Sequence, residues 1–299
     1  MRLSIFLAEY AYAYYLWERN MKEYIINGGR MLEGTVDIRG AKNSILPLLA
    51  GCILTDEIIV LHDCPYISDV DSMIKILEGL GCKIIRNDRD LIVDSSGVYN
   101  SQIPSSLAKE LRSSIFLLGS LLSRLKKAKV AYPGGCDIGL RPIDIHIAGL
   151  KELNIDIQEQ GGFIICNSQN ARCADVVLDL PSVGATENLM MSSVFIKGKT
   201  VIRNCAKEPE IVDLQKFLNA MGAKIKGAGS SVIVVEGVDK LHGVEYTPIP
   251  DRIVAGTYLI ATAMCGGNVE LRNVNSEHIS SLISKLSKTT CKIYVKNDR

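Results

Sequence analysis

The feature that most restricts the fold of this chain is an internal repeat. Four segments follow one order: an apolar helix, a strand, a loop, an amphipathic helix and a hairpin. The junctions between the second helix and the hairpin read LGCKI, LNIDI, MGAKI and TTCKI, and we take Cys82, Asn154, Ala223 and Cys291 as equivalent positions, 68 to 72 residues apart. A regular period of this kind indicates supersecondary units that bury their apolar faces against their neighbours.

The first helix of each unit is apolar on nearly all sides. These helices are predicted at residues 41–54, 111–123, 184–196 and 252–264. The second helices, such as those at 68–81 and 209–222, have one apolar stripe and one polar face. A helix without a polar face is normally buried. We therefore expect an α/β fold in which buried helices are wrapped by sheets, the reverse of the usual layering.

Composition narrows the classes of function. The chain of 299 residues has 34 basic and 33 acidic residues without a long basic run, which argues against a nucleic-acid partner. Its nine cysteines are spread singly, with no C-x-x-C pair and only four histidines. This pattern fits neither a disulfide framework nor a zinc site. It predicts a chain without a metal, in the reducing cytoplasm.

Residues 1–20 precede the repeats and resemble a signal peptide only in part. An apolar run extends from Leu3 to Trp17, but Glu9 interrupts it and no small-x-small cleavage site precedes Met21. The run is also shorter than the roughly 20 residues that a membrane-spanning helix needs. We expect no membrane insertion. Residues 1–20 are interpreted as an N-terminal extension, either an added helix or a mis-assigned start, before a first strand that begins near Met21.

The fourth unit ends early. The hairpin of the first unit reads CKIIRNDRDLIV, whereas that of the fourth reads CKIYVKNDR and stops within the turn. A strand without its return partner exposes unpaired backbone groups. The repeat therefore predicts a longer protein that has been cut short, and an early cap of the last unit is the alternative.

A glycine-rich loop carries the first candidate functional residues. In AYPGGCDIGLRPIDIH, the glycines around Cys136 allow the backbone to approach a ligand closely. Arg141 can hold an anion, and Pro142 can open a helix at its first position, which leaves Arg141 near free N–H groups. Asp144 can bond to a ligand or pair with Arg141, and His146 is interpreted as a packed helix residue. The alternative is a surface loop with an incidental cysteine.

Two further helix starts carry polar residues. Lys42 and Asn43 follow Gly40 at the start of a buried helix, where free N–H groups and the helix dipole favour an anion. Arg112 occupies the matching place in the second unit, so the two cations are predicted to face one cleft. Ser182 stands at the same place in the third unit, as a ligand-binding residue or an ordinary N-cap. Solvated side chains at helix ends are the alternative for the two cations.

The environment of each thiol predicts its reactivity. Cys136 lies in a glycine loop beside cations, whereas Cys52 and Cys265 fall in predicted apolar helices. Neighbouring cations favour the reactive thiolate and an apolar environment disfavours it. We therefore expect Cys136 to be the most readily alkylated thiol.

Four motifs in one order, GAKNSILPLLAG, LRSSIFLLG, PGGCDIGLRPIDIH and PSVGATEN, resemble those of the UDP-N-acetylglucosamine 1-carboxyvinyltransferases, a family of enolpyruvyl transferases. The resemblance extends from about Met21 to Arg299. It implies an inside-out α/β barrel built of repeated units, with buried helices and outer sheets, in two domains. Residues 42–250 are then the complete domain, and residues 21–41 and 251–299 belong to an incomplete second domain.

The resemblance also implies a reaction and its residues. The family moves the enolpyruvyl group of phosphoenolpyruvate to the 3-hydroxyl of UDP-N-acetylglucosamine through a tetrahedral intermediate, and thereby begins peptidoglycan precursor synthesis. These two small molecules are the implied partners, and neither a cofactor nor a metal is implied. Cys136 is the implied catalytic residue, a general acid toward the methylene carbon. The implied substrate-binding residues are Lys42, Asn43, Arg112, Arg141, Pro142, Ile143, Asp144, Ile145, Ser182 and Val183.

Two alternatives stay open from sequence. One is a catalytically silent sugar-nucleotide-binding remnant. The other is the related 3-phosphoshikimate 1-carboxyvinyltransferase, a family that lacks the PGGCDIG loop. The resemblance places the base for the sugar hydroxyl, and further arginines, in a part that this chain does not contain. We therefore expect the 299-residue chain to turn over poorly or not at all.

Overall fold

The computed structural model describes residues 11–15, 22–103, 112–131 and 143–296. The chain forms two compact units. The larger unit is Arg39–Asp251, and the smaller combines Met1–Ile38 with Arg252–Arg299. The larger unit holds nearly all of the hydrophobic core, whereas the core of the smaller one is centred on Ile38, Ala255 and Ile279.

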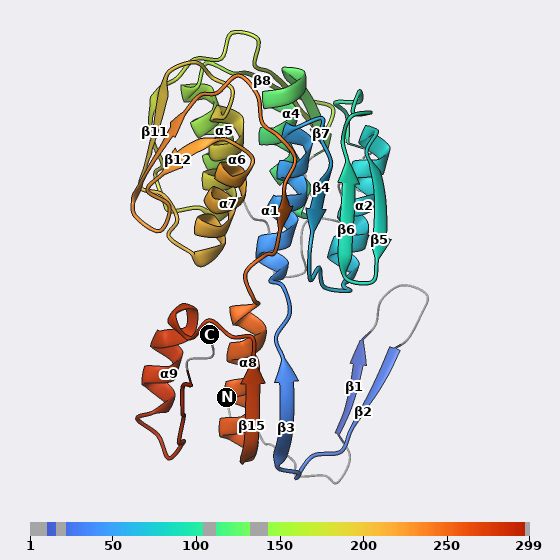
Figure 1. Ribbon diagram of the computed structural model, residues 1–299, viewed down its shortest axis with the longest axis vertical. Coiled ribbons are helices and arrows are strands. Elements are labelled where there is room, and N and C mark those ends of the chain that lie inside the picture. The colour runs from blue at the N-terminus through green and yellow to red at the C-terminus, as the bar shows by residue number, and fades with distance from the viewer. Residues whose placement is uncertain (1–10, 16–21, 104–111, 132–142, 297–299) are drawn as a thin grey trace. The chain divides into compact units, whose positions relative to one another are not determined.

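Each of the three repeats in the larger unit contributes a buried helix, a strand, a second helix and a hairpin (Figure 1). The first consists of α1 (Lys42–Gly51) with the short turn η1 (Cys52–Leu54), β4 (Ile59–Leu61), α2 (Ser68–Leu80), β5 (Lys83–Asn87) and β6 (Asp90–Asp94). The second consists of η2 (Arg112–Phe116), α4 (Leu117–Leu125), β7 (Lys127–Ala131), α5 (Asp144–Glu152), β8 (Asp156–Gln160) and β9 (Phe163–Asn167). The third consists of β10 (Asp175–Val177), α6 (Val183–Ser193), β11 (Lys199–Arg203), α7 (Pro209–Ala220), β12 (Lys224–Lys226) and β13 (Val232–Glu236).

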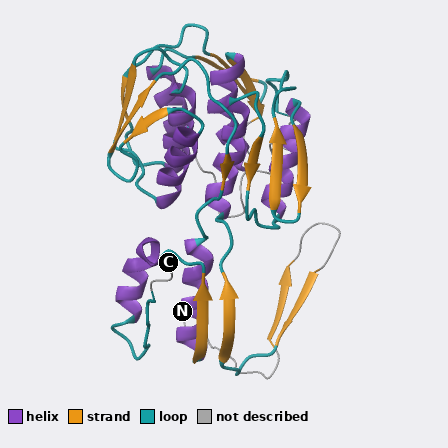
Figure 2. Ribbon diagram, viewed as in Figure 1, coloured by secondary structure: helices purple, strands orange, loops and turns teal. Residues whose placement is uncertain are grey.

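The predicted layering is confirmed in the larger unit. Helices α1, α4 and α6 are buried along most of their length, and the strands lie outside them (Figure 2). The strands, with β14 at Glu245–Tyr246, form separate sheets in the orders β10-β11-β13-β12, β14-β4-β6-β5 and β7-β9-β8, so the described strands do not close into a barrel. The second helices bury one stripe, as in α2, where Val70, Met73 and Leu77 face the core.

In all three repeats, the backbone adopts the same left-handed conformation at the junction between the second helix and the hairpin. Gly81, Asn154 and Gly222 follow the three second helices, and all have positive φ, at 111°, 59° and 103°. A left-handed residue after a helix ends the helix and redirects the chain, and glycine and asparagine tolerate it best. The equivalence predicted for Cys82, Asn154 and Ala223 is therefore wrong by one residue at the first and third positions. The left-handed residue defines the register of the repeat, and the cysteines do not.

Two strands pair with partners that lie far away in the sequence. Strand β3 (Leu32–Asp37) directly precedes α1 in sequence but pairs in parallel with β15 (Gly267–Arg272) of the smaller unit. Strand β14 (Glu245–Tyr246) follows the third repeat and pairs in parallel with β4 of the first. In the third repeat, by contrast, β10 precedes α6 and stays in its own sheet beside β11. The chain therefore returns to its first sheet before it leaves the larger unit at Asp251.

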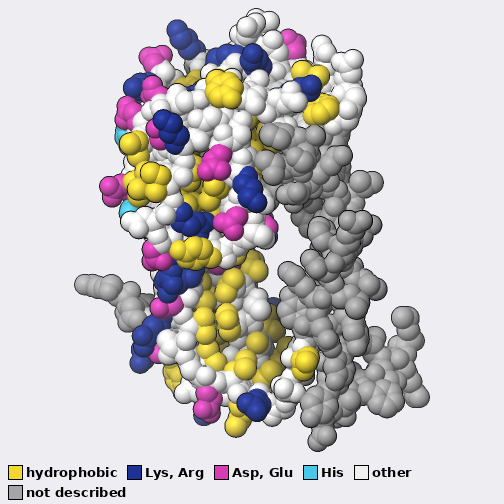
Figure 3. Space-filling model, turned by 90° about the vertical axis from the view of Figure 1, so that its right-hand side faces the viewer, with side chains coloured by type: hydrophobic (Ala, Val, Ile, Leu, Met, Phe, Trp, Pro, Cys, Tyr) yellow, Lys and Arg dark blue, Asp and Glu magenta, His cyan; other side chains and the backbone are white. Residues whose placement is uncertain are grey.

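The smaller unit contains β1 (Ala11–Tyr15), β2 (Lys22–Ile26), β3, α8 (Arg252–Cys265), β15, the short turn η3 (Ser276–Ile279) and α9 (Ser280–Leu286). The prediction that residues 252–264 form a buried helix is wrong. The helix forms, but only Ala255 and Gly256 are buried. Its exposed large apolar side chains are Ile253, Val254, Tyr258, Ile260 and Met264. Figure 3 shows hydrophobic side chains gathered on the smaller unit. The reason is physical: the described elements of this unit supply too few neighbours to surround an apolar helix.

Both ends of the chain differ from expectation. Residues 11–15 form a strand that pairs antiparallel with β2, so a helix is wrong for this stretch. Alternating tyrosines and alanines suit a strand, because aromatic residues favour the pleated conformation. At the other end, residues 291–296, which carry the CKI sequence of the fourth junction, do not form a strand. In the smaller unit, then, the last repeat is recognisable by α8, β15 and α9 but has no hairpin through residue 296.

Candidate functional site

The buried helices of the larger unit run parallel, so their starts share one end of the bundle. Ser123, near the end of α4, donates to the carbonyl of Met191 near the end of α6, at 2.7 Å. Arg124 donates to the carbonyl of Ile53, just past the end of α1, at 2.8 Å. The C-terminal ends of the three helices therefore meet. Their opposite ends begin with Lys42 in α1, Arg112 in η2, which leads into α4, and Ser182 as the N-cap of α6. We call this opposite end the helix-start end.

Lys42 and the start of α1 already have carboxylate partners. The Lys42 ammonium lies 2.9 Å from Oδ2 of Asp69, and its backbone N–H donates to Oδ2 of Asp251 at 3.2 Å. Asn43, the next residue, is exposed. The expectation of a free N–H at this helix start is therefore wrong for Lys42. An anion does bind there, as the helix dipole favours, but it is the protein's own Asp251. A ligand phosphate must compete with Asp69 for the ammonium.

Buried Asp213 of α7 holds the first turn of α1 in place. Its carboxylate accepts hydrogen bonds from the Ser44 hydroxyl, the Tyr246 hydroxyl at 2.6 Å and the Ile249 amide at 3.2 Å. Burial raises the pKa of Asp213, and these three hydrogen bonds oppose that rise. The cluster ties the residue two positions after Lys42 to α7 and to the chain segment that follows β14. Asp213 therefore fixes where the Lys42 side chain starts.

The start of α6 is capped as predicted. The Ser182 hydroxyl accepts a hydrogen bond from the Ala185 amide at 3.3 Å, and the Ser182 carbonyl accepts one from the Thr186 hydroxyl at 2.7 Å. Thr186 in turn accepts from the Ala206 amide at 3.2 Å, which ties this turn to the segment before α7. Val183 begins the helix and is only partly buried. The N-cap role of Ser182 leaves Val183 at the rim of the helix-start end.

Helix α5 begins later than predicted. Its first residue is Asp144, with Ile143 as N-cap, so Pro142 precedes the helix by two positions. Asp144 is exposed, Ile145 is partly buried and Ile143 is buried. His146 is buried, as the interpretation of a packed helix residue predicted, and its Nδ1 lies 2.9 Å from the side-chain amide nitrogen of Asn188 in α6. The start of α5 is thereby joined to α6.

Glu187, beside Asn188, is a fully buried acid. Among the described residues, neither carboxylate oxygen of Glu187 has a hydrogen-bond partner. Burial raises the pKa of Glu187 well above its ordinary value, and the neighbouring Glu210 and Glu208 add to the rise. A buried carboxyl group without a partner is stable only in its neutral form. Burial therefore favours the neutral carboxyl group of Glu187 over the charged carboxylate.

Several predicted site residues lie outside the described residues. Cys136, Arg141 and Pro142 fall in residues 132–142, and for Arg112 the structure gives the backbone of η2 only. Cys265 corrects one expectation about the thiols, because it is the last residue of α8 and is exposed. The thiols of Cys64, Cys82 and Cys166 are buried, and burial raises the pKa of each to about 12. Within the described part of the chain, no cluster of His, Cys, Asp or Glu is arranged to hold a metal ion.

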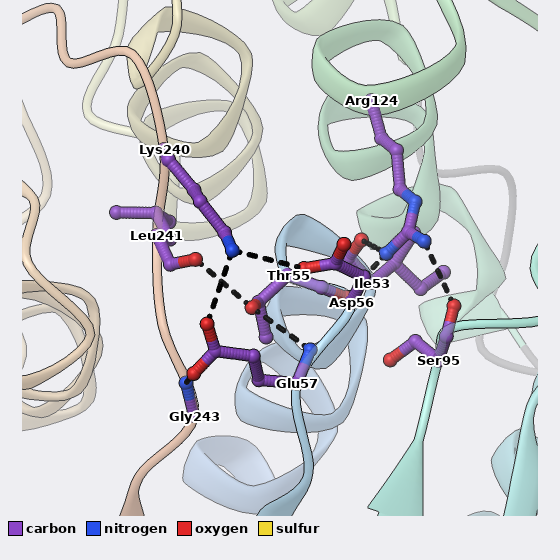
Figure 4. A network of polar contacts seen from close by, with 9 residues as sticks. All are labelled: Ile53, Thr55, Asp56, Glu57, Ser95, Arg124, Lys240, Leu241 and Gly243. Carbon is purple, nitrogen blue, oxygen red and sulfur yellow. Dashed lines mark hydrogen bonds and ion pairs between the residues drawn. The ribbon is translucent and has the colours of Figure 1, made fainter.

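At the C-terminal ends of the buried helices lies a cavity of about 490 Å³, but the cations that line it are engaged (Figure 4). Arg124 donates to the carbonyls of Ile53, Thr55 and Ser95 and so satisfies the end of the first helix. Lys240 lies 3.1 Å from Oε1 of Glu57. This network closes the C-terminal ends of the helices and stabilises the fold.

Sequence reasoning missed the acidic partners and one amide. Asp69, Asp213, Asp251 and Asn188 were not predicted as site residues, although all four bond to residues at the helix-start end. For Asn188 a signal was present, because a polar residue within the helix GATENLMMSSVFI must find hydrogen bonds when that helix is buried. For the three aspartates the partners come from distant parts of the chain, and no local pattern marks them.

Known proteins share both the sequence and the fold. The family model described as EPSP synthase (3-phosphoshikimate 1-carboxyvinyltransferase) matches residues 26–299. The chain belongs to the enolpyruvyl transferase family. A relative from Caldanaerobacter subterraneus subsp. tengcongensis, named UDP-N-acetylglucosamine 1-carboxyvinyltransferase 2, is 55% identical over 278 residues, which are 93% of this chain and 67% of the relative. One from Thermotoga maritima, named UDP-N-acetylglucosamine 1-carboxyvinyltransferase, is 44% identical over 92% of this chain and 66% of its own length.

Solved enolpyruvyl transferases have the same fold. The enolpyruvyl transferase NikO from Streptomyces tendae matches with a TM-score of 0.78 at 20% identity, over 91% of this chain and 65% of NikO. EPSP synthase from Acinetobacter baumannii matches with a TM-score of 0.73 at 17% identity, over 91% of this chain and 62% of its own. The chain thus spans about two thirds of the length of these family members. None of the described helices has the length and apolar character needed to cross a membrane.

Proposed function

We propose that this protein acts as a UDP-N-acetylglucosamine 1-carboxyvinyltransferase. It transfers the enolpyruvyl group of phosphoenolpyruvate to the 3-hydroxyl of UDP-N-acetylglucosamine and releases phosphate. The observation that carries the proposal is the 55% identity, across 93% of the chain, to a relative of that name. In a cell this reaction serves the cytoplasmic synthesis of peptidoglycan precursors, and through it wall biogenesis, cell shape and division.

The proposed chemistry needs an acid, a cationic phosphate site and a nucleotide site. By resemblance, Cys136 protonates the methylene carbon of phosphoenolpyruvate while the sugar hydroxyl attacks the adjacent carbon. Loss of phosphate and of a proton from the new methyl group then restores the double bond. Lys42 and Arg141 hold the phosphate as it leaves, because cations stabilise the developing charge. Asn43 and Arg112 complete the ligand site at the helix-start end.

The nucleotide subsite is proposed at the starts of α5 and α6. It consists of Arg141, Pro142, Ile143, Asp144 and Ile145 on one side and Ser182 and Val183 on the other. Two features of the described residues support it: the hydrogen bond between His146 and Asn188 that joins the two helices, and the cap that leaves the Ser182–Val183 turn well defined. Exposed Asp144 can accept from the uridine ring, and partly buried Ile145 and Val183 can contact its faces.

A silent sugar-nucleotide-binding protein is the second candidate. It is favoured by the exposed apolar face of α8, which the described residues leave uncovered. The nucleotide subsite lies within the larger unit, so binding does not depend on α8.

Two measurements separate the candidates. Calorimetric titration with UDP-N-acetylglucosamine tests the nucleotide site, and phosphate release from phosphoenolpyruvate with that sugar nucleotide tests the transferase. We expect binding, with slow or absent turnover in a polypeptide limited to these 299 residues. Binding without phosphate release selects the silent candidate for that polypeptide. Phosphate release with shikimate 3-phosphate, and none with the sugar nucleotide, would contradict the proposed substrate.

A further inference from the structure

One buried amide links three separate segments of the helix-start end. Asn188 lies in the middle of α6 and is fully buried. Its Oδ1 accepts from the Gly119 amide at 2.8 Å, its Nδ2 donates to the Ile115 carbonyl at 3.0 Å, and Nδ2 also lies 2.9 Å from Nδ1 of His146. These partners belong to α4, η2 and α5.

The backbone partners define the orientation of the amide. The Gly119 N–H can only donate, so the atom that faces it is Oδ1, and the Ile115 carbonyl can only accept, so the atom that faces it is Nδ2. Nδ1 of His146 must therefore accept from Nδ2. It follows that the neutral ring of His146 carries its proton on Nε2. Asn188 thus determines which ring nitrogen of His146 carries the proton, because the amide cannot be turned over without losing its bonds to Gly119 and Ile115.

Helices α4 and α5 both approach α6 closely around Asn188. A Cβ atom at Gly119 would lie 2.5 Å from the Asn188 carbonyl oxygen, and one at Gly184 would lie 2.9 Å from Cε1 of His146. Glycine at both positions allows α4, α5 and α6 to come close enough for the amide to reach all three partners. Packing alone does not require an amide, because leucine has the same branched arrangement of side-chain heavy atoms, although it is larger, and has no polar group to satisfy.

The three segments that Asn188 joins are those that carry proposed substrate residues. Ile115 is three residues after Arg112 in the short turn η2, and His146 directly follows Asp144 and Ile145 at the start of α5. Asn188 itself lies on the helix that begins at Val183. A shift of any one segment relative to the others would therefore strain or break one of these hydrogen bonds.

We propose that Asn188 is a positioning residue for sugar-nucleotide binding, which aligns the starts of η2, α5 and α6 through Gly119, Ile115 and His146. The proposal rests on the proposed function for the identity of the ligand only. Asn188 touches no substrate in this assignment. Its effect is to hold two segments of the subsite at a fixed distance from the third.

The test compares Asn188→Leu with a matched control at the other end of the same helix pair. Ser123→Ala removes the hydrogen bonds from α4 to the Met191 and Ser192 carbonyls of α6, and Ser123 is also buried. Calorimetric titration of the full chain with UDP-N-acetylglucosamine should show a Kd at least tenfold higher for Asn188→Leu and changed less than threefold for Ser123→Ala. Equal effects in the two variants, or an unchanged Kd in Asn188→Leu, would overturn the proposal.

A ligand-free readout separates this inference from the proposed function. In the unchanged protein, nitrogen NMR of His146 should show Nδ1 without a proton and Nε2 with one. Amide hydrogen exchange at residues 115–119 and 144–149 should accelerate together in Asn188→Leu and not in Ser123→Ala. A proton on Nδ1, or acceleration in only one segment, refutes the alignment role whether or not the nucleotide binds. If the unchanged protein passes these tests but binds no nucleotide, the proposed function fails and the alignment stands.

Folding of the variant does not limit the test. If Asn188→Leu does not fold, Asn188→Asp replaces it, because Asp keeps the acceptor for the Gly119 amide and loses the donors to Ile115 and His146. The tautomer of His146 is measured on the unchanged protein and is decisive by itself: Nδ1 carrying the proton excludes the hydrogen bond on which the proposal depends.

Discussion

Replacing Tyr246 by phenylalanine isolates the hydrogen bond that anchors the start of α1. The Tyr246 hydroxyl donates to Oδ1 of Asp213 at 2.6 Å, while its ring packs edge-to-face on Phe217, with ring centroids 5.3 Å apart. Phenylalanine keeps the ring contact and removes only the hydroxyl. The carboxylate then retains the Ser44 hydroxyl and the Ile249 amide as donors.

The expected loss follows from the charge of the acceptor. A hydrogen bond to a charged group contributes about 1.5–3 kcal/mol, so Tyr246→Phe should lower the free energy of unfolding by about that amount. For a unit of this size, where each kcal/mol shifts Tm by about 2–4 °C, the expected decrease in Tm is roughly 3–12 °C. Exposed Tyr99 provides the control, since Tyr99→Phe should change stability by less than about 0.5 kcal/mol.

The pH dependence checks the mechanism. Burial raises the pKa of Asp213 in the folded protein above its pKa in the unfolded chain. The contribution of this raised pKa to the free energy of unfolding is therefore complete at pH values below the pKa in the unfolded chain, and it is lost as pH rises through the pKa in the folded protein. Loss of the Tyr246 donor raises that folded pKa further. The stability gap between the unchanged protein and Tyr246→Phe should therefore widen with rising pH and narrow in acid.

Urea unfolding followed by circular dichroism at several pH values measures this gap. A gap below about 0.5 kcal/mol at neutral pH, an equal loss in Tyr99→Phe, or a gap that widens in acid would refute the role assigned to the hydroxyl.

Three further outcomes are expected. Lys42→Ala should weaken phosphoenolpyruvate binding by about 1–3 kcal/mol, and Asp69→Asn should strengthen it by releasing the ammonium; calorimetry measures both, and stronger binding by Lys42→Ala would contradict the phosphate role. Brief treatment with a thiol reagent should label Cys136 and exposed Cys265 before the buried cysteines, as peptide mass spectrometry can show. Ile260→Lys should reduce self-association of the 299-residue chain in light scattering, because it breaks the exposed apolar face of α8; an unchanged particle mass in an associating sample would exclude that face as the cause.

The sequence was sufficient for features that depend on local pattern. Three helices that are apolar on nearly all sides were correctly predicted to be buried, and the N-cap at Ser182 was recognisable from a serine before a buried helix. The repeat was visible because each unit repeats the same periodicities of helix and strand. The motifs were also sufficient to identify the enolpyruvyl transferase family, because short loops and helix starts carry residue types that neighbouring packing does not explain.

Tertiary structure decided which groups meet. Ser44 and Asp213 are 169 residues apart, and Asn188 and Gly119 are 69 apart, so no window along the chain contains both partners. The same holds for burial. Helices α1 and α8 have similar apolar sequences, yet one is buried and the other largely exposed, because burial depends on how many neighbouring elements surround a helix. Periodicity is a property of a segment, whereas contact and burial are properties of the whole fold.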